Sequence, residues 1–179
     1  MEPLAVQVGV RLPREPEAMG EWLADAASFD AAGADALWVD GGPRWDVLAL
    51  TAALAVTTYR SLLVVALPDT RSAELSRTLD TLERLSQGRL ALLADGPRAV
   101  VPTRTRVFRR LPDGVVEAEV GRWVPVPAPE GRAAWRDTCA GAAESGVRGV
   151  VVPAGPLLLD LLRNPEDPTG RGDLHLAQG

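Results

Sequence analysis

The sequence predicts an α/β fold in which helices cover a parallel sheet. Two observations support this class. Short, nearly continuous apolar runs alternate with longer segments in which apolar residues recur every three or four positions. Strands without polar alternation are typical of parallel sheets buried on both faces, and strand–helix alternation is how such sheets are connected.

The first half of the chain keeps this alternation without interruption. Gly33 and Gly88 follow two of the helical segments, and Ser72 precedes one, as expected of helix ends and an N-cap. The elements predicted in chain order are a strand at 4–12, a helix at 16–34, a strand at 36–40, a helix at 45–58, a strand at 61–69, a helix at 72–88 and a strand at 89–95.

The middle of the chain has a different character. Residues 97–131 contain short alternating runs and frequent prolines but no helical pattern. The stretch RVFRRLPDGVVEAEV at 106–120 predicts a hairpin with Pro112, Asp113 and Gly114 as its turn. The βα alternation then resumes, with a helix at 130–146, a strand at 147–155, a helix at 156–165 and a polar tail at 166–179.

Composition excludes several classes of function. The net charge of −5 argues against a nucleic-acid surface, which needs a positive face. No apolar run approaches the roughly 20 residues of a membrane span, and the N-terminus does not resemble a signal peptide, so we expect a cytoplasmic protein. The single cysteine, Cys139, excludes an intrachain disulfide and is expected to be a buried, inert thiol.

Several motifs in the first half resemble one family. The stretches FDAAGADALWVDGG, WDVLALTAALAVTTYRSLLVVALP and RTLDTLERLSQGRLALLADG resemble, in order and spacing, the luciferase-like flavin- and deazaflavin-dependent oxidoreductases (monooxygenases). The resemblance covers residues 4–98, and a weaker similarity extends over 146–176. It implies a (β/α)8 barrel with FMN or a deazaflavin at the C-terminal ends of the strands.

The chain is too short for a complete barrel of that family. Such a barrel needs about 250 residues, whereas this chain has 179. We therefore expect a single domain that forms an incomplete or compressed (β/α) barrel of the TIM type, similar to the truncated non-luminescent flavoproteins. Its parts are βα units at 1–98, a β-hairpin-like segment at 99–129 in place of the middle units, βα units at 130–165 and the tail. The exposed strand edges need cover, either from 99–127 or from a partner chain.

The loop after the second predicted strand is the first candidate site. In the family an acidic residue and an active-site histidine follow this strand, but here Gly41 follows Asp40. Gly41 and Gly42 allow a ligand to approach the backbone, or they form an ordinary turn in which Asp46 caps the next helix. Trp45 either stacks on a flavin or packs into the core.

Other candidates follow later strands. The pair Ala66 and Leu67 matches the family's cis peptide beside the flavin ring, with Leu67–Pro68 as the alternative cis bond. Asp95, Gly96 and Arg98 follow the fourth strand.

The guanidinium of Arg98 could pair with a phosphate, or it could be a solvated loop arginine. Gly155, which precedes a helix that begins with Pro156, forms either a phosphate cradle or a plain turn.

Two further chemistries receive little support. The only histidine, His175, lies in the polar tail and is expected at the surface, so no catalytic residue is assigned. Four aspartates, Asp35, Asp40, Asp46 and Asp95, could gather at one barrel mouth and hold a metal, but no histidine accompanies them, and no metal ligand is assigned.

Three functions therefore remain open at this level. The chain is a small flavin-dependent oxidoreductase, a degenerate relative with weakened or lost catalysis, or a non-catalytic subunit that pairs with a full-length homologue. The expected partners are flavin and a second chain, as a homodimer or a heteromer. The missing histidine and the missing middle of the barrel favour the second and third functions.

Overall fold

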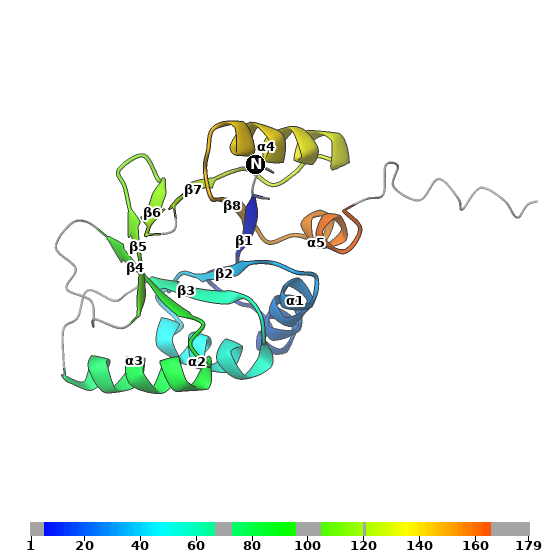
Figure 1. Ribbon diagram of the computed structural model, residues 1–179. Helices are drawn as coiled ribbons and strands as arrows, with labels where there is room; N and C mark the ends of the chain where they lie inside the picture. Colours follow the sequence, from blue (N-terminus) through cyan, green and yellow to red (C-terminus); the bar gives the residue numbers. More distant parts are fainter. Residues whose placement is uncertain (1–5, 67–72, 96–104, 120, 166–179) are drawn as a thin grey trace, which may run out of the picture.

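The fold is described from a computed structural model that places residues 6–66, 73–95, 105–119 and 121–165 (Figure 1). No described helix has the length and apolar character needed to cross a membrane. The strands are β1 (Gln7–Arg11), β2 (Ala36–Val39), β3 (Leu62–Ala66), β4 (Leu90–Asp95), β5 (Arg106–Arg110), β6 (Val116–Ala118), β7 (Gly121–Pro125) and β8 (Gly149–Pro153). The helices are α1 (Met19–Ala31), α2 (Val47–Thr57), α3 (Ala73–Leu85), α4 (Arg132–Glu144) and α5 (Pro156–Arg163).

The strands pair in chain order and close into a ring. Seven of them, from β7 through β8 and β1 to β5, form one curled parallel sheet. Strand β6 is antiparallel to both β5 and β7 and joins the two ends of that sheet. The α/β class is therefore confirmed, and the curled sheet is compatible with a compressed barrel.

The predicted hairpin is present. Strands β5 and β6 are joined by a turn in which the Gly114 amide donates to the Leu111 carbonyl over 3.0 Å and the Val115 amide donates to Asp113 Oδ1 over 3.1 Å. Gly114 has φ +80°, a conformation that favours glycine. Strand β7 follows directly. The sequence pattern had not predicted a separate strand there. Residues 106–125 thus supply the cover that the strand edges needed.

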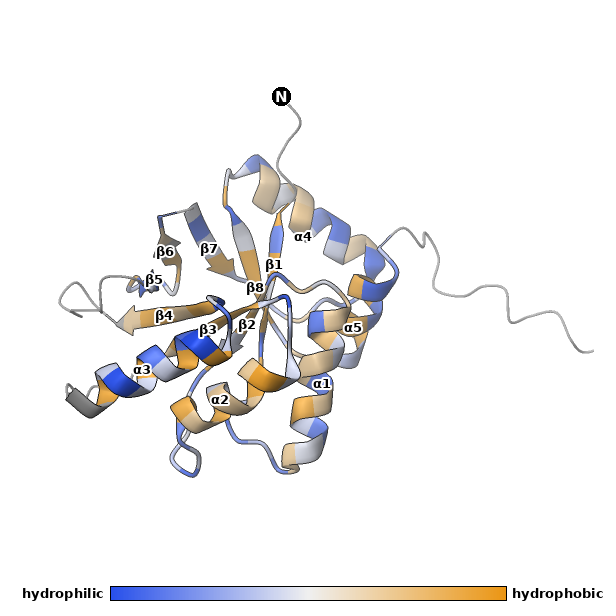
Figure 2. Ribbon diagram, turned by 60° about the horizontal axis from the view of Figure 1, so that its bottom comes forward, coloured by the Kyte–Doolittle hydropathy of each residue, from blue (hydrophilic) through white to orange (hydrophobic). Residues whose placement is uncertain are grey.

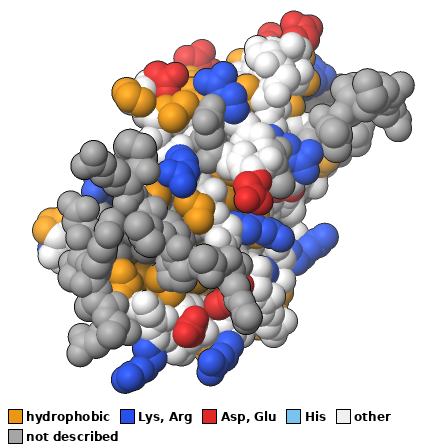
Figure 3. Space-filling view, turned by 60° about the vertical axis from the view of Figure 1, so that its left-hand side comes forward, with side chains coloured by type: hydrophobic (Ala, Val, Ile, Leu, Met, Phe, Trp, Pro, Cys, Tyr) orange, Lys and Arg blue, Asp and Glu red, His pale blue; other side chains and the backbone are white. Residues whose placement is uncertain are grey.

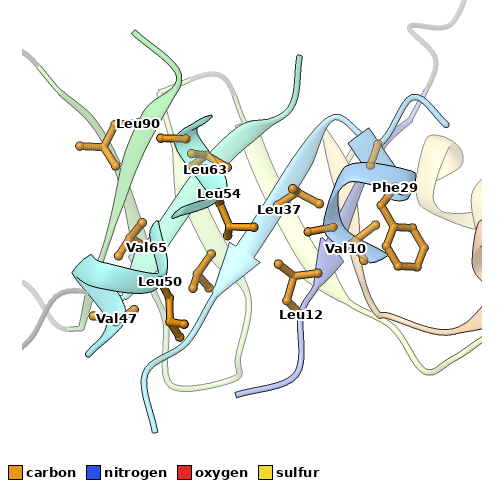
Figure 4. Packing of buried hydrophobic residues seen from close by; sticks show 14 of the residues in the cluster. Val10, Leu12, Phe29, Leu37, Val47, Leu50, Leu54, Leu63, Val65 and Leu90 are labelled. Carbon is orange, nitrogen blue, oxygen red and sulfur yellow. The ribbon is translucent and has the colours of Figure 1, made fainter. Parts of the chain in front are cut away.

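Helices cover the outside of one part of the ring. Figure 1 shows α2 and α3 side by side below β2, β3 and β4, with α4 on the opposite side of the ring. The strand side chains that face these helices are apolar and buried, and they pack against buried residues of α1 and α2 (Figure 4). They include Val10, Leu37, Leu63, Val65 and Leu90.

The inside of the ring is filled by aromatic side chains. Trp38, Phe108 and Trp123 come from β2, β5 and β7 and are at most 2% exposed. Their ring centroids lie 5.4 to 6.1 Å apart in edge-to-face arrangements. Gly9 gives Trp38 its space, because a Cβ there would lie 2.3 Å from the indole nitrogen. The ring therefore encloses a packed core.

A buried polar network explains one of the family-like motifs. Asp30, at the end of α1, accepts hydrogen bonds from the amides of Tyr59, Arg60 and Ser61 and from the Ser61 hydroxyl. Burial alone raises the pKa of Asp30, but these donors outweigh it and hold the pKa below its ordinary value. Arg89 follows Gly88 in the family-like stretch RTLDTLERLSQGRLALLADG (the GR pair), and it donates to the carbonyls of Ala55, Thr58 and Ser61. The GR pair therefore serves to join α2 to the strands.

Candidate functional site

Asp40 is the centre of a charged cluster at the C-terminal mouth of the ring. It directly follows β2, so its side chain continues the inward row of Ala36 and Trp38. Its Oδ2 lies 3.7 Å from Arg11 Nε, at the end of β1, and its Oδ1 lies 3.4 Å from an Arg110 terminal nitrogen, at the end of β5. Since β5 is three strands away from β2, the pair with Arg110 spans the mouth.

The cluster keeps a net positive charge near solvent. Asp40 is 15% exposed, whereas the side chains of Arg11 and Arg110 are 38% and 37% exposed. Arg11 Nε is itself buried and has no hydrogen-bond partner among the described residues. The partly exposed guanidinium of Arg11, which shares Asp40 with Arg110, can accept a further anion, such as a phosphate, through its terminal nitrogens.

Neither arginine was a candidate in the sequence analysis, although a signal for both was present. The stretches QVGVR and RVFRR place Arg11 and Arg110 at the last strand position, with the same parity as Gly9 and Phe108. Alternate strand residues share a face, so this parity points both arginines towards the inside of the mouth.

The two glycines after Asp40 serve contacts between loops. The Gly41 carbonyl accepts hydrogen bonds from Arg14 at 2.9 and 3.2 Å. A Cβ on Gly42 would clash with Glu15 Oε1, and Glu15 also forms an ion pair with Arg44 at 3.1 Å. The glycines thus let this loop lie against the loop after β1, which supports the ordinary-turn interpretation.

The start of α2 gives one confirmation and one correction. Asp46 accepts hydrogen bonds from the amides of Leu48 and Ala49, both at 2.9 Å, and so caps the helix as predicted. Trp45 is 37% exposed, so the interpretation that it packs into the core was wrong. Its indole is available for stacking at the same mouth.

The remaining candidates are distributed around the same end of the ring. Ala66 ends β3, the backbone of Asp95 ends β4 opposite Arg110, and Gly155 precedes α5 in an extended conformation. Leu67, Gly96 and Arg98 lie outside the described residues, as do both candidate cis bonds and His175.

The four aspartates do not form one group. Asp35 precedes β2 and Asp40 follows it, so these two lie at opposite ends of the strand. Asp46 is occupied by its cap. Within the described ranges, no three histidine, cysteine or acidic side chains are placed to bind a metal ion together.

Cys139 lies on α4, away from the mouth. Burial raises the pKa of its thiol, which keeps it protonated and unreactive at neutral pH. The thiol is half-buried, whereas full burial was expected.

Comparison of the sequence with known protein families and with curated proteins finds no match.

Proposed function

We propose that this protein is a flavin- or deazaflavin-binding relative of the luciferase-like oxidoreductases, with a compressed barrel of the TIM type and weakened or lost catalysis. The observation that supports it best is the convergence of Arg11 and Arg110 on Asp40 at the C-terminal mouth. Parallel α/β barrels bind ligands at this end.

The cluster suits the phosphate group of FMN or of a deazaflavin cofactor. Arg11 brings a partly exposed guanidinium group to the mouth, and Arg110 places a second one across from it beside the same carboxylate. The aromatic core leaves no room for the flavin rings inside the ring of strands, so they would lie on its mouth, within reach of Trp45. When bound, the flavin would supply hydride or oxygen chemistry, while the protein positions it.

Weakened catalysis follows from the residues at this corner. The family's histidine position holds Gly41, whose carbonyl is occupied by Arg14. Both carboxylate oxygens of Asp40 are engaged by arginines. With glycine at the histidine position and the neighbouring carboxylate engaged, binding without efficient turnover is the expected behaviour.

Titration with FMN and riboflavin tests this proposal. FMN should quench tryptophan fluorescence and bind at least tenfold more tightly than riboflavin, which lacks the phosphate. Arg11→Gln and Arg110→Gln should each remove most of that advantage, whereas Arg77→Gln on the exposed face of α3 should not. No flavin binding at millimolar concentration, or equal affinity in all variants, would overturn the proposal.

A second candidate function is that of a non-catalytic subunit, and α2 favours it. This helix has no charged residue, and its outward side carries Ala49 and Val56, both exposed, with Tyr59 just beyond its end at 77% exposed. Figure 2 shows α2 as largely apolar, whereas α3 beside it is strongly polar on its outer side. A helix that is apolar all round is normally covered on every side.

Light scattering coupled to size-exclusion chromatography tests the pairing of two such chains. The expected result is a dimer that Val56→Glu converts to a monomer. Leu157→Glu, at a similarly exposed apolar position on α5, should leave the dimer intact. A monomer at all concentrations would exclude self-pairing.

A further inference from the structure

A cavity opens at the N-terminal mouth of the ring, at the opposite end from Asp40. Its volume is about 290 Å³, and it is lined by residues from the starts of β1, β3 and β5, the end of β6, and β7. Arg11, Asp40, Trp45 and Arg110 are not among its described lining residues. The volume lies just below the roughly 300–1,000 Å³ typical of ligand pockets, which suits a ligand of about one ring.

One side of the cavity is apolar and rigid. Phe108 and Trp123 are each 1% exposed, and their rings lie 6.1 Å apart at 66°. Gly149 fixes the indole of Trp123, because a Cβ there would lie 2.5 Å from Cε3. Leu62 adds a half-buried aliphatic side chain. The two rings form the base of the cavity, and Leu62 offers more accessible apolar surface beside them.

The other side of the cavity carries a positioned cation. Arg148 Nε donates to Gln7 Oε1 over 3.0 Å, and Gln7 Nε2 donates to Asp35 Oδ1 over 3.4 Å. Asp35 is itself held by the Val8 amide over 2.8 Å. The two terminal nitrogens of Arg148 make no hydrogen bond to any described residue. The bond from Nε therefore orients the guanidinium group, while its terminal nitrogens are left to bind a ligand.

Two more charged groups set the charge of the cavity. Arg106 and Glu119 line it, and neither side chain has an ion pair or hydrogen bond within the described ranges. Among the described lining residues, two arginines stand against one glutamate, so these side chains together carry one net positive charge. This balance suits a monoanion better than a phosphate dianion.

We propose that this cavity binds a small monocarboxylate with a single-ring apolar body. Its carboxylate pairs with the terminal nitrogens of Arg148, with Arg106 adding attraction, and its ring lies against Phe108 and Trp123. Binding here is independent of flavin binding, which uses the other mouth.

Phenylacetate is a suitable probe, with neutral phenylacetamide as the matched analogue without the charge. Calorimetry should detect phenylacetate binding, and the indole N–H signal of Trp123 should shift in nitrogen-resolved NMR spectra. Arg148→Gln should weaken binding about tenfold or more, because a charge-assisted pair is lost. Arg106→Gln should weaken it less, and Arg77→Gln should leave it unchanged.

Folding of the variants is controlled separately. Arg148→Gln loses the bond to Gln7, so its thermal unfolding is compared with that of the wild type. Arg106→Gln loses no side-chain hydrogen bond to a described residue, so it keeps the test valid if Arg148→Gln is unstable. Arg11→Gln should bind phenylacetate normally, whatever the outcome of the FMN titration. Equal affinity for phenylacetate and phenylacetamide, or no binding at millimolar concentration, would overturn the proposal.

Discussion

Two parts of the strand ring are built on different physical principles. The helical arc, β8 and β1 to β4, presents apolar side chains to the helices, and these side chains are buried. In the meander arc, β5 to β7, the outward residues are more accessible: Arg109 and Arg122 are exposed, and Val107 and Val124 are only partly buried. Figure 3 shows the molecule from the side that lies on the left in Figure 1, where basic and hydrophobic side chains are interspersed.

This difference between the two arcs shows how a short chain can close a ring of strands. A parallel strand requires a long crossover, usually a helix, whereas an antiparallel neighbour needs only a short turn. Strand β6 therefore joins the two ends of the parallel sheet with three residues and a turn at Gly114. The meander arc contributes Phe108 and Trp123 to the interior, so closure does not need a helix layer on its outside.

The largest predicted effect concerns the interior side chain that connects the two arcs. Trp38 belongs to the helical arc and contacts Phe108 and Trp123 of the meander arc. Trp38→Ala should lower the free energy of unfolding by about 3–5 kcal/mol, measured by urea denaturation. Trp45→Ala, at a half-exposed position, should cost less than about 1 kcal/mol. Equal losses would show that the arcs do not depend on the shared core.

The second effect concerns a network found in the helical arc. Asp30→Asn replaces a buried carboxylate that accepts four hydrogen bonds, and it should cost about 2 kcal/mol at pH 7. Because the folded-state pKa of Asp30 is lowered, its stabilisation is present above the unfolded-state pKa and is lost as pH falls through the folded value. The stability difference between the two proteins should therefore shrink below about pH 4.

Urea denaturation at pH 7 and at pH 3 measures this change. Asp25→Asn, at an exposed position on the same helix, is the control and should have little effect at either pH. A difference that stays constant between the two pH values would contradict the assignment of a lowered pKa.

The smallest expected difference is between the same substitution made once in each arc. Val65 faces the helices and is fully buried, whereas Val124 of the meander arc is half-buried. Val65→Ala should cost about 2 kcal/mol, and Val124→Ala less than about 1 kcal/mol. Chemical denaturation of both variants gives the ratio. A larger loss at Val124 would show that the meander arc is covered by more than the described residues.

Much of the fold was predictable because it depends on local patterns. The apolar runs gave β1 to β4 and β8, helical spacing gave α1 to α5, and the Pro112–Gly114 turn gave the hairpin. Asp46 as a cap was predictable for the same reason, since its partners lie two and three residues away. Strand β7 was missed because its short run, GRWVP, lacks a clear pattern.

The sites depended on contacts that no local pattern contains. Asp40 was predicted as a candidate, but its partner Arg110 is 70 residues away, and their meeting depends on the closure of the ring. The residues that orient the cation of the cavity, Gln7 and Arg148, are 141 residues apart. Hydrophobic periodicity and turn chemistry are local, and they were enough to predict the order and type of most elements. Which charges share a mouth follows from the three-dimensional fold, because strand curvature and closure bring distant strand ends together.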